Sequence, residues 1–233
     1  SRDKQGLFPE IISKFFDDRQ KYKKLMIAAQ SEYEETKNPA LLSDISKYNN
    51  FQMARKIQLN SLFGAMGNEY FRYYDTRIAE GITMSGQLII RETAIALDDY
   101  LNKVCDTEDE MYSFYSDTDS CYITMNNLVQ KFFKGKSKDQ IVDMLDQIGN
   151  DKIEPVINKA MERLANDTHA FQHKIIFKRE AIADRGLWVA KKRYALNVSD
   201  NEGVRYKEPK LKVMGLEIVR SSTPAPVRES LRK

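Results

Sequence analysis

Apolar residues in the first third of the chain recur at steps of three, four or seven residues, the spacing of a helix face. This run comprises Ile11, Phe15, Tyr22, Met26, Ala29 and Tyr33. Pro9 is predicted at the first helical position, where its missing N–H costs nothing. The pattern predicts one long amphipathic helix ahead of the break at Lys37-Asn38-Pro39.

A second helical run follows the break and reaches Phe63. Asn38 is the predicted N-cap and Pro39 the predicted first residue of this helix. Gly64 and Gly67 are expected to end it. Two helices joined by so short a break predict an antiparallel hairpin over residues 1–67.

The middle of the chain combines a strongly periodic helix with a pair of strands. The helix is predicted from Ile90, Ala94, Leu97, Leu101 and Val104, which are expected to face a core. After an acidic loop, residues 112–124 read as two short strands around a turn at Asp117-Thr118-Asp119.

The last third changes from a helix to strands. Ser137 and Gln140 form a capping-box pattern, and Pro155 is predicted to kink or restart the helix. Strands are predicted at 175–177, 187–198 and 210–214, with turns at 184–186 and 200–203, before a helix that follows Pro224. This order predicts an α+β fold in which helices pack on an antiparallel sheet.

Composition excludes several classes of protein. Hydrophobic residues make up 42% and charged residues 30% of 233, which suits a packed core. No apolar run approaches the roughly 18 residues of a membrane span, so no membrane partner is expected. Two cysteines make no disulfide framework and predict a reducing compartment. His169 and His173 lack companions for a zinc site, and we interpret them as structural.

Charge is informative in its distribution. The formal net charge is only +3, but residues 174–212 hold eleven basic and five acidic side chains. This excess predicts a basic face of the kind that contacts nucleic acid.

Asp117 and Asp119 are the sharpest candidate site. Residues two apart on a strand point the same way, so both carboxylates are expected to face one site. Two like charges held together favour a cation between them, and Mg²⁺ prefers carboxylates together with substrate phosphates. The alternative is a solvated turn rich in aspartate.

Two groups of residues on the predicted hairpin suit a phosphate-bearing ligand. Lys56, Asn60 and Phe63 stand at i, i+4 and i+7 on one helix face. Arg19 and Lys23 are one turn apart on the other helix and are candidates to join Lys56 around one polyanion. The alternative for both groups is an ordinary solvated helix face.

Lys191-Lys192-Arg193-Tyr194 is predicted to lie on a strand, with Lys192 and Tyr194 sharing one face and Lys191 and Arg193 the other. Interleaved basic and aromatic groups suit a nucleic-acid backbone and base stack. An edge strand guarded by lysines is the alternative. Glu180, on the preceding strand, either points toward the same site or pairs with a lysine.

Three segments together resemble motifs of family B DNA polymerases. Lys56-Ile57-Gln58-Leu59-Asn60-Ser61-Leu62-Phe63-Gly64 resembles their K-x-x-x-N-S-x-Y-G motif, Tyr115-Ser116-Asp117-Thr118-Asp119-Ser120 their Y-G-D-T-D-S motif, and residues 191–194 their K-K-x-Y segment. The sequence around these motifs, including Phe71–Asp75 and Met214–Glu217, is similar to that of the replicative polymerases of T-even-type bacteriophages.

The resemblance implies a right-handed polymerase, with fingers at 1–67, palm at 68–220 and the start of a thumb at 221–233. Arg19, Lys23, Lys56 and Asn60 would contact the triphosphate of the incoming deoxynucleotide, with Phe63 beside the nascent base pair. Asp119, with Asp117 beside it, would ligate two catalytic Mg²⁺ ions. Lys191, Lys192 and Tyr194 would hold primer-template DNA, and Glu180 matches a palm carboxylate.

The sequence departs from the family pattern at two positions, and one motif of the family is absent from it. Phe63 replaces a tyrosine and Ser116 a glycine, so the resemblance does not predict fidelity or turn geometry at these two positions. The D-x-x-S-L-Y-P-S segment that bears the other catalytic carboxylate does not occur, and both ends look cut. We therefore expect a polymerase fragment or one chain of a split enzyme, inactive alone.

Further partners follow from the resemblance. The amino-terminal, exonuclease and remaining thumb portions would act in cis or as a second chain, a sliding clamp is a candidate partner, and the cytoplasm of an infected bacterium is the expected location. A non-catalytic nucleic-acid-binding module is the alternative. A palm-type RNA polymerase or reverse transcriptase is a third reading, against which the segments at 56–64 and 191–194 argue.

Overall fold

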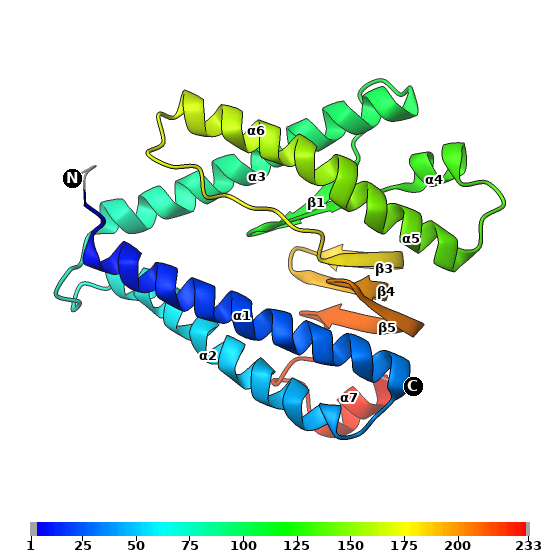
Figure 1. Ribbon diagram of the computed structural model, residues 1–233, viewed down its shortest axis with the longest axis horizontal. Helices are drawn as coiled ribbons and strands as arrows, with labels where there is room; N and C mark the ends of the chain where they lie inside the picture. Colours follow the sequence, from blue (N-terminus) through cyan, green and yellow to red (C-terminus); the bar gives the residue numbers. More distant parts are fainter. Residues whose placement is uncertain (1–3, 232–233) are drawn as a thin grey trace. The chain divides into compact units, whose positions relative to one another are not determined.

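A computed structural model describes residues 4–231 of the chain, which form helices and antiparallel strands (Figure 1). The helices are α1 (Leu7–Thr36), α2 (Leu41–Met66), α3 (Thr76–Cys105), α4 (Asn126–Phe132), α5 (Lys138–Ile148), the π-helical turn η1 (Gly149–Ile153), α6 (Glu154–Asp167) and α7 (Ala225–Leu231). The strands are β1 (Ser113–Asp117), β2 (Ser120–Ile123), β3 (Ala181–Ala190), β4 (Arg193–Asn201) and β5 (Val204–Met214). This content confirms the predicted α+β class.

The chain divides into two compact units. The first contains residues 4–89 with Ala165–His173, and the second contains Ile90–Leu164 with residues 174–231. No helix within residues 4–231 has both the length and the apolar character that a membrane crossing requires.

The first unit is built on the predicted hairpin of α1 and α2. The Arg55 side chain bonds to Asp18 Oδ2 at 3.2 Å and lies 5.4 Å from the centroid of the Phe15 ring. One turn along, the rings of Tyr22 and Phe51 lie 5.0 Å apart. From the first contact to the second, the residue number rises from 18 to 22 on α1 and falls from 55 to 51 on α2. The two helices are therefore antiparallel, as predicted.

The helix ends differ from the prediction in three places. Pro9 is the third helical residue, tolerated there because N–H groups of the first turn have no intrahelical partner. Asn38 caps the turn before α2: its Oδ1 accepts the Ala40 N–H at 3.1 Å, and the helix begins only at Leu41. The predicted cap was therefore wrong by two residues. At the other end α2 continues through Gly64, and Gly67 is its C-cap.

The second unit contains two antiparallel sheets. In the hairpin of β1 and β2, Asp117 pairs with Ser120 across a turn of two residues, Thr118 and Asp119. The other sheet has the order β3-β4-β5, and places Tyr194 between Trp188 and Met214. The strand pair predicted at 112–124 is confirmed.

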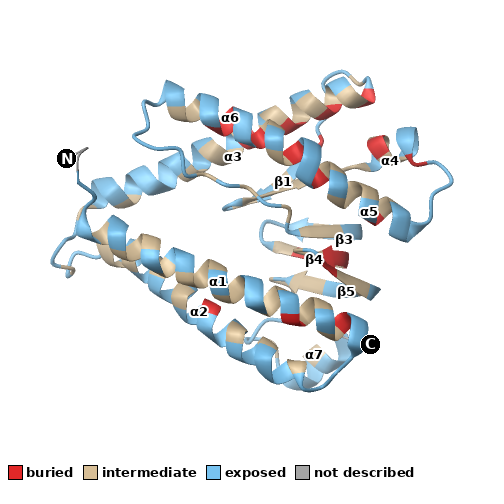
Figure 2. Ribbon diagram, viewed as in Figure 1, coloured by how far each residue is buried: buried red, intermediate tan, exposed pale blue. Residues whose placement is uncertain are grey.

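Buried residues of the second unit gather along α3, α6 and β4 (Figure 2). On α3 the buried residues stand at four-residue steps: Thr93, Leu97, Leu101 and Cys105. Leu97 and Leu101 were predicted, whereas Ile90, Ala94 and Val104 are only half-buried. On β4 the buried residues include Tyr194, Leu196 and Val198, which alternate along the strand as one face of a sheet requires.

The long helical region after residue 137 follows the prediction closely. Ser137 accepts the backbone N–H of Gln140, and the Gln140 side chain accepts that of Ser137. Pro155 is the second residue of α6, and α6 directly follows η1. Because proline has no N–H to donate to the fourth residue before it, a widened turn replaces the regular α-helical ladder there.

The strands after residue 174 differ from the predicted ones. Residues 174–180 form no strand, and β3 runs through the turn predicted at 184–186. The β3–β4 register shifts between Ala183 and Arg185, so the strand carries a bulge where a turn was expected. The hairpin turn is instead at Lys191 and Lys192, so the strand predicted at 187–198 is wrong and is divided between β3 and β4. The predicted second turn is confirmed at Glu202-Gly203.

Gly186 makes room for an aromatic ring. A Cβ on this residue would lie 2.3 Å from the Trp188 ring and 3.0 Å from Leu196 Cδ2. Gly186→Ala is therefore expected to lower the free energy of unfolding by about 1–3 kcal/mol, measured by urea denaturation. Gly81→Ala is the control, because Gly81 lies within a helix and has open space around it. It should stabilise by about 0.5–1 kcal/mol; equal effects of both changes would contradict this packing.

Candidate functional site

The aspartate hairpin has a tight tip. Thr118 has φ 59°, and the Asp119 N–H donates to the Asp117 carbonyl at 2.7 Å. The Thr118 hydroxyl donates to Asp117 Oδ1 at 3.1 Å, and Ser120 Oγ donates to the Asp117 carbonyl at the same distance. Asp117 is half-buried at the end of β1, and Asp119 is exposed in the turn. Local hydrogen bonds thus fix the backbone that carries both carboxylates.

The base of this hairpin is held by Asp98 of α3. Its Oδ1 accepts the backbone N–H groups of Tyr112 at 3.0 Å and Ser113 at 2.7 Å, and its Oδ2 accepts the Ser113 hydroxyl at 2.8 Å. Sequence reasoning missed Asp98, because no local pattern links it to a strand fourteen residues later. The carboxylate hairpin is therefore anchored directly to the buried half of α3.

An aromatic cluster joins the hairpin to the larger sheet. It consists of Tyr115, Tyr122, Trp188 and Tyr194, whose ring centroids lie 5.4 to 6.2 Å apart. The hydroxyls of Tyr122 and Tyr194 are 2.7 Å apart, within hydrogen-bond distance. Tilted and edge-on ring contacts of this kind add stabilisation beyond the buried area. The cluster fixes the carboxylate hairpin against β3 and β4.

Tyr194 belongs to this cluster and is only 4% exposed. Burial raises the pKa of its phenol above the usual range, and the Tyr122 hydroxyl and the charges of Asp117 and Glu180 raise it further. The phenol therefore stays neutral. The predictions that Lys192 shares a strand face with Tyr194, and Lys191 with Arg193, are wrong, because both lysines lie in the turn that precedes β4.

The Lys191–Lys192 turn lies beside the carboxylate hairpin. The Lys192 N–H donates to the Tyr115 hydroxyl at 2.7 Å, and Lys192 Nζ lies 3.7 Å from Asp117 Oδ1. The lysine side chain is 64% exposed, so this ion pair contributes little stability by itself. The ion pair shows instead that the aspartate hairpin and the Lys191–Lys192 turn, which were identified from separate motifs, lie next to each other.

Residues after β5 pack against the same turn. Gly215 has φ +63°, and a Cβ on it would lie 2.1 Å from the Lys192 carbonyl oxygen. Glu217 forms an ion pair with Arg193. The segment Met214–Glu217 therefore supports the turn from its carbonyl side.

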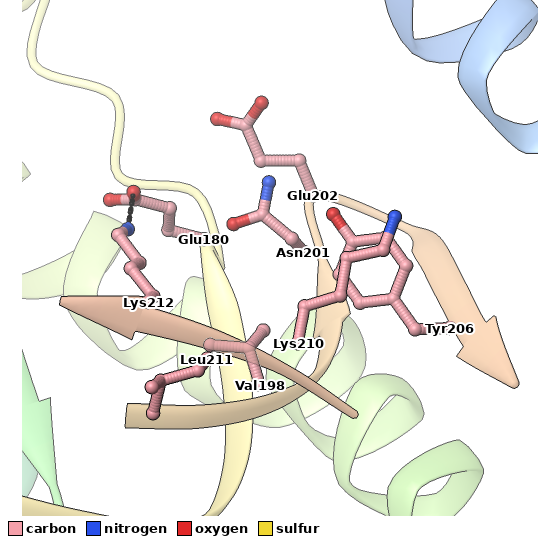
Figure 3. A pocket seen from close by; sticks show the side chains of 8 residues that line it. All are labelled: Glu180, Val198, Asn201, Glu202, Tyr206, Lys210, Leu211 and Lys212. Atoms are coloured by element: carbon pink, nitrogen blue, oxygen red, sulfur yellow. Dashed lines mark hydrogen bonds and ion pairs between the residues drawn. The ribbon is translucent and has the colours of Figure 1, made fainter. Parts of the chain in front are cut away.

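Glu180 lies just before β3, beside a shallow cavity of about 400 Å³ (Figure 3). Its Oε1 accepts a hydrogen bond from Lys212 Nζ at 2.7 Å. Lys210 lies in the same wall with its ammonium 4.0 Å from the centroid of the Tyr206 ring. Of the two alternatives for Glu180, the lysine pair is the one that the structure contains.

The other candidates lie in the first unit. Lys56, Asn60 and Phe63 are exposed on α2, as expected for one face of the helix. Arg19 and Lys23 are half-buried on α1, and the contact between Asp18 and Arg55 brings Arg19 level with Lys56 along the hairpin. Arg19 Nε is buried, and within residues 4–231 it has no hydrogen-bond partner.

The available metal ligands are carboxylates rather than thiols. Burial, and then the charge of Asp98, raise the pKa of the Cys121 thiol to about 11, so it stays protonated at neutral pH. Across the described part of the chain, no three aspartate, glutamate, histidine or cysteine side chains are grouped closely enough to hold a metal ion. A cation at Asp117 and Asp119 would thus need further oxygen ligands from outside this set.

The three motifs lie in a chain whose sequence matches one family over nearly its full length. The profile of DNA polymerase family B matches residues 1–232. The chain belongs to DNA polymerase family B.

Several DNA polymerases are similar to it. The DNA-directed DNA polymerase of Escherichia phage RB69 is 36% identical, covering 100% of this chain and 31% of the relative. That of Enterobacteria phage T4 is 35% identical, covering 100% and 32%. A DNA polymerase of Thermococcus gorgonarius is 28% identical over 94% of this chain and 22% of its own length. The chain thus spans about a third of the two phage relatives.

Proposed function

We propose that the chain supplies the fingers and most of the palm of a template-directed DNA polymerase. The fingers are residues 1–67, the palm 68–220 and the start of the thumb 221–233, of which the last two residues lie outside the described structure. Deoxynucleotides would be added to a primer 3′-end in phage DNA replication, in the cytoplasm of an infected bacterium.

One observation carries the proposal: Asp117 and Lys192 meet, although 75 residues separate them in the sequence. A carboxylate hairpin beside a basic turn suits a reaction between two phosphate-bearing substrates, since one group attracts metal ions and the other attracts the DNA backbone. Family membership supports the same reading, because the carboxylates and the lysine lie in the two segments that resemble the family's motifs.

Asp117 and Asp119 fit Mg²⁺ by their chemistry, since carboxylate oxygens are the hard ligands that this ion prefers. Bound there, two Mg²⁺ ions would polarise the α-phosphate and lower the pKa of the attacking primer 3′-hydroxyl. The chain's own part is to hold the two carboxylates on a fixed hairpin tip. Phosphate oxygens of the substrates and a further carboxylate would complete the coordination.

The cationic residues of the hairpin α1–α2 would bind the triphosphate. Lys56 and Asn60 share one face of α2, and Arg19 and Lys23 are one turn apart on α1. Arg19 Nε, which has no hydrogen-bond partner among residues 4–231, is a buried donor that an anion reaching it would satisfy. These groups would neutralise charge on the leaving pyrophosphate, and Phe63 would pack near the nascent base pair.

The second catalytic carboxylate would come from a segment outside these 233 residues, which contain no D-x-x-S-L-Y-P-S sequence. The remaining amino-terminal, exonuclease and thumb portions would act in cis or as a second chain, and a sliding clamp is a candidate partner. The isolated chain is therefore expected to be inactive.

A complementation assay tests the proposed function. The 233-residue chain alone, and the same chain joined to the remaining portions of the polymerase, are incubated with primer-template DNA, deoxynucleotides and Mg²⁺. We expect extension only from the joined protein. Extension by the isolated chain would refute the claim that a second catalytic carboxylate must come from outside it. No extension by either protein would refute the assignment as a polymerase.

Lys56→Ala in the joined polymerase is expected to raise KM for the incoming deoxynucleotide by about ten- to hundredfold, because a charge-assisted contact to phosphate is lost. Steady-state kinetics at saturating DNA measure this value. Lys47→Ala is the matched control, since Lys47 is another exposed lysine of α2. If both variants raise KM equally, Lys56 has no specific contact with the triphosphate.

A further inference from the structure

The backbone of Lys192 is held in an unfavourable conformation. Lys192 has φ 60°, in the left-handed region that side chains other than glycine seldom occupy. Such a conformation persists only where surrounding contacts enforce it, and it is most informative beside a functional site.

Two different segments enforce this conformation. On one side, the Lys192 N–H donates to the Tyr115 hydroxyl at 2.7 Å. On the other, the Lys192 carbonyl packs so closely on Gly215 that a Cβ there would lie 2.1 Å from the oxygen. The backbone on both sides of the Lys192 Cα is therefore fixed from outside the turn.

The Tyr115 ring cannot easily move away from this contact. Its centroid lies 5.4 Å from that of Tyr122, 5.7 Å from that of Tyr194 and 6.2 Å from that of Trp188. Tyr115 and Asp117 are two residues apart on β1 and are both half-buried, as members of one strand face. One face of β1 thus carries both a metal-site carboxylate and the hydroxyl that holds the basic turn.

We propose that Tyr115 is a positioning residue, whose hydroxyl holds the Lys191–Lys192 turn where the lysines meet the DNA backbone next to the carboxylate hairpin. The inference rests on the proposed function, because it takes the turn as a contact to primer-template DNA. The Lys192 ammonium lies 3.7 Å from Asp117 Oδ1. When DNA binds, a phosphate would replace this carboxylate as its partner. The backbone of the turn stays in place during that exchange.

Tyr115→Phe tests the proposal because it removes the hydroxyl and keeps the ring. Amide hydrogen exchange on the 233-residue chain should show the Lys192 N–H exchanging at least about tenfold faster, since its acceptor is gone. Fluorescence anisotropy with a labelled primer-template duplex should show about three- to tenfold weaker binding. The slope of log affinity against log salt should fall by about one, because one phosphate contact is no longer made reliably.

Tyr112→Phe is the matched control. Its hydroxyl bonds to Thr107 Oγ1 at 2.8 Å and to Asn127 Nδ2 at 3.2 Å, away from the turn. This variant should lose stability but keep both the Lys192 amide protection and the salt slope. If Tyr112→Phe and Tyr115→Phe change the slope equally, Tyr115 acts only through stability and the proposal is overturned.

Lys192→Ala separates this inference from the proposed function. Unchanged DNA binding in Lys192→Ala would refute the turn as a DNA contact, and with it that part of the proposed function. Weaker binding in Lys192→Ala with unchanged binding in Tyr115→Phe would overturn only the positioning role. Weaker binding in both, with faster Lys192 exchange in Tyr115→Phe, supports the positioning role.

Discussion

Asp119→Asn is expected to lower the rate of primer extension by roughly 10²–10³-fold or more in the joined polymerase. The substitution keeps the size of the side chain and its place at the exposed tip, but it removes the negative charge that a divalent cation needs. Binding of primer-template DNA should remain, because the basic turn at Lys191–Lys192 is unchanged. Single-turnover extension and DNA anisotropy on the same preparation measure both quantities.

Asp109→Asn is the control for this experiment. Asp109 is exposed in the loop after α3 and has a positive φ, which asparagine also tolerates. It should leave extension within about twofold of the unaltered protein, as expected for a surface change without a specific role. If Asp119→Asn also keeps nearly full synthesis, the hairpin is a solvated turn, and a non-catalytic nucleic-acid-binding module becomes the better reading.

Asp200→Ala is expected to destabilise the second unit by about 3–5 kcal/mol, which is large relative to the stability of most domains. The Asp200 side chain is 3% exposed, pairs with Arg179 and lies 3.4 Å from Arg205 Nε. Its Oδ1 also accepts the Gly203 N–H at 3.0 Å, in the turn between β4 and β5. Removing the carboxylate leaves the largely buried Arg179 without one of its two carboxylate partners.

Asp143→Ala provides the comparison for Asp200→Ala. Asp143 pairs with the same Arg205 at 2.8 Å, but its side chain is 70% exposed. Exposed ion pairs contribute at most about 1 kcal/mol, so this variant should unfold at nearly the same urea concentration as the unaltered chain. Equal losses from the two variants would show that burial of Asp200 does not determine its contribution.

The helices were predictable from sequence because their signals are local. Apolar periodicity located α1 and the second half of α3, the break at Lys37-Asn38-Pro39 separated α2 from α1, and the capping box at Ser137 gave the start of α5 correctly. The first half of α3, before Ile90, was not predicted. The bulged β3 was mistaken for a turn because Asp184-Arg185-Gly186 has turn composition. In the structure Asp184 instead pairs with Lys138 and Asn197, and Gly186 accommodates Trp188. Those reasons lie in tertiary packing, which short windows of sequence do not contain.

The candidate site was predictable where it lies in a motif and not where it depends on contacts between motifs. Asp117 and Lys192 were both identified in sequence, but their proximity was not. Asp98 and the hydroxyl of Tyr115 were missed because each acts on a backbone N–H far along the chain. The role expected of Tyr194 in DNA binding stays a prediction, and its buried ring shows that it also supports the sheet.

Cleavage of the joined polymerase by a bound metal ion tests the central claim most directly. Fe²⁺ is substituted for Mg²⁺ in the presence of primer-template DNA, and hydrogen peroxide and ascorbate are added. The Fe²⁺ reduces peroxide to hydroxyl radicals, which cut the backbone close to the ion. Cuts are expected around residues 117–120 and around the Lys191–Lys192 turn, and Asp119→Asn should abolish both. Cuts elsewhere with these two segments intact would contradict a metal site at the aspartate hairpin.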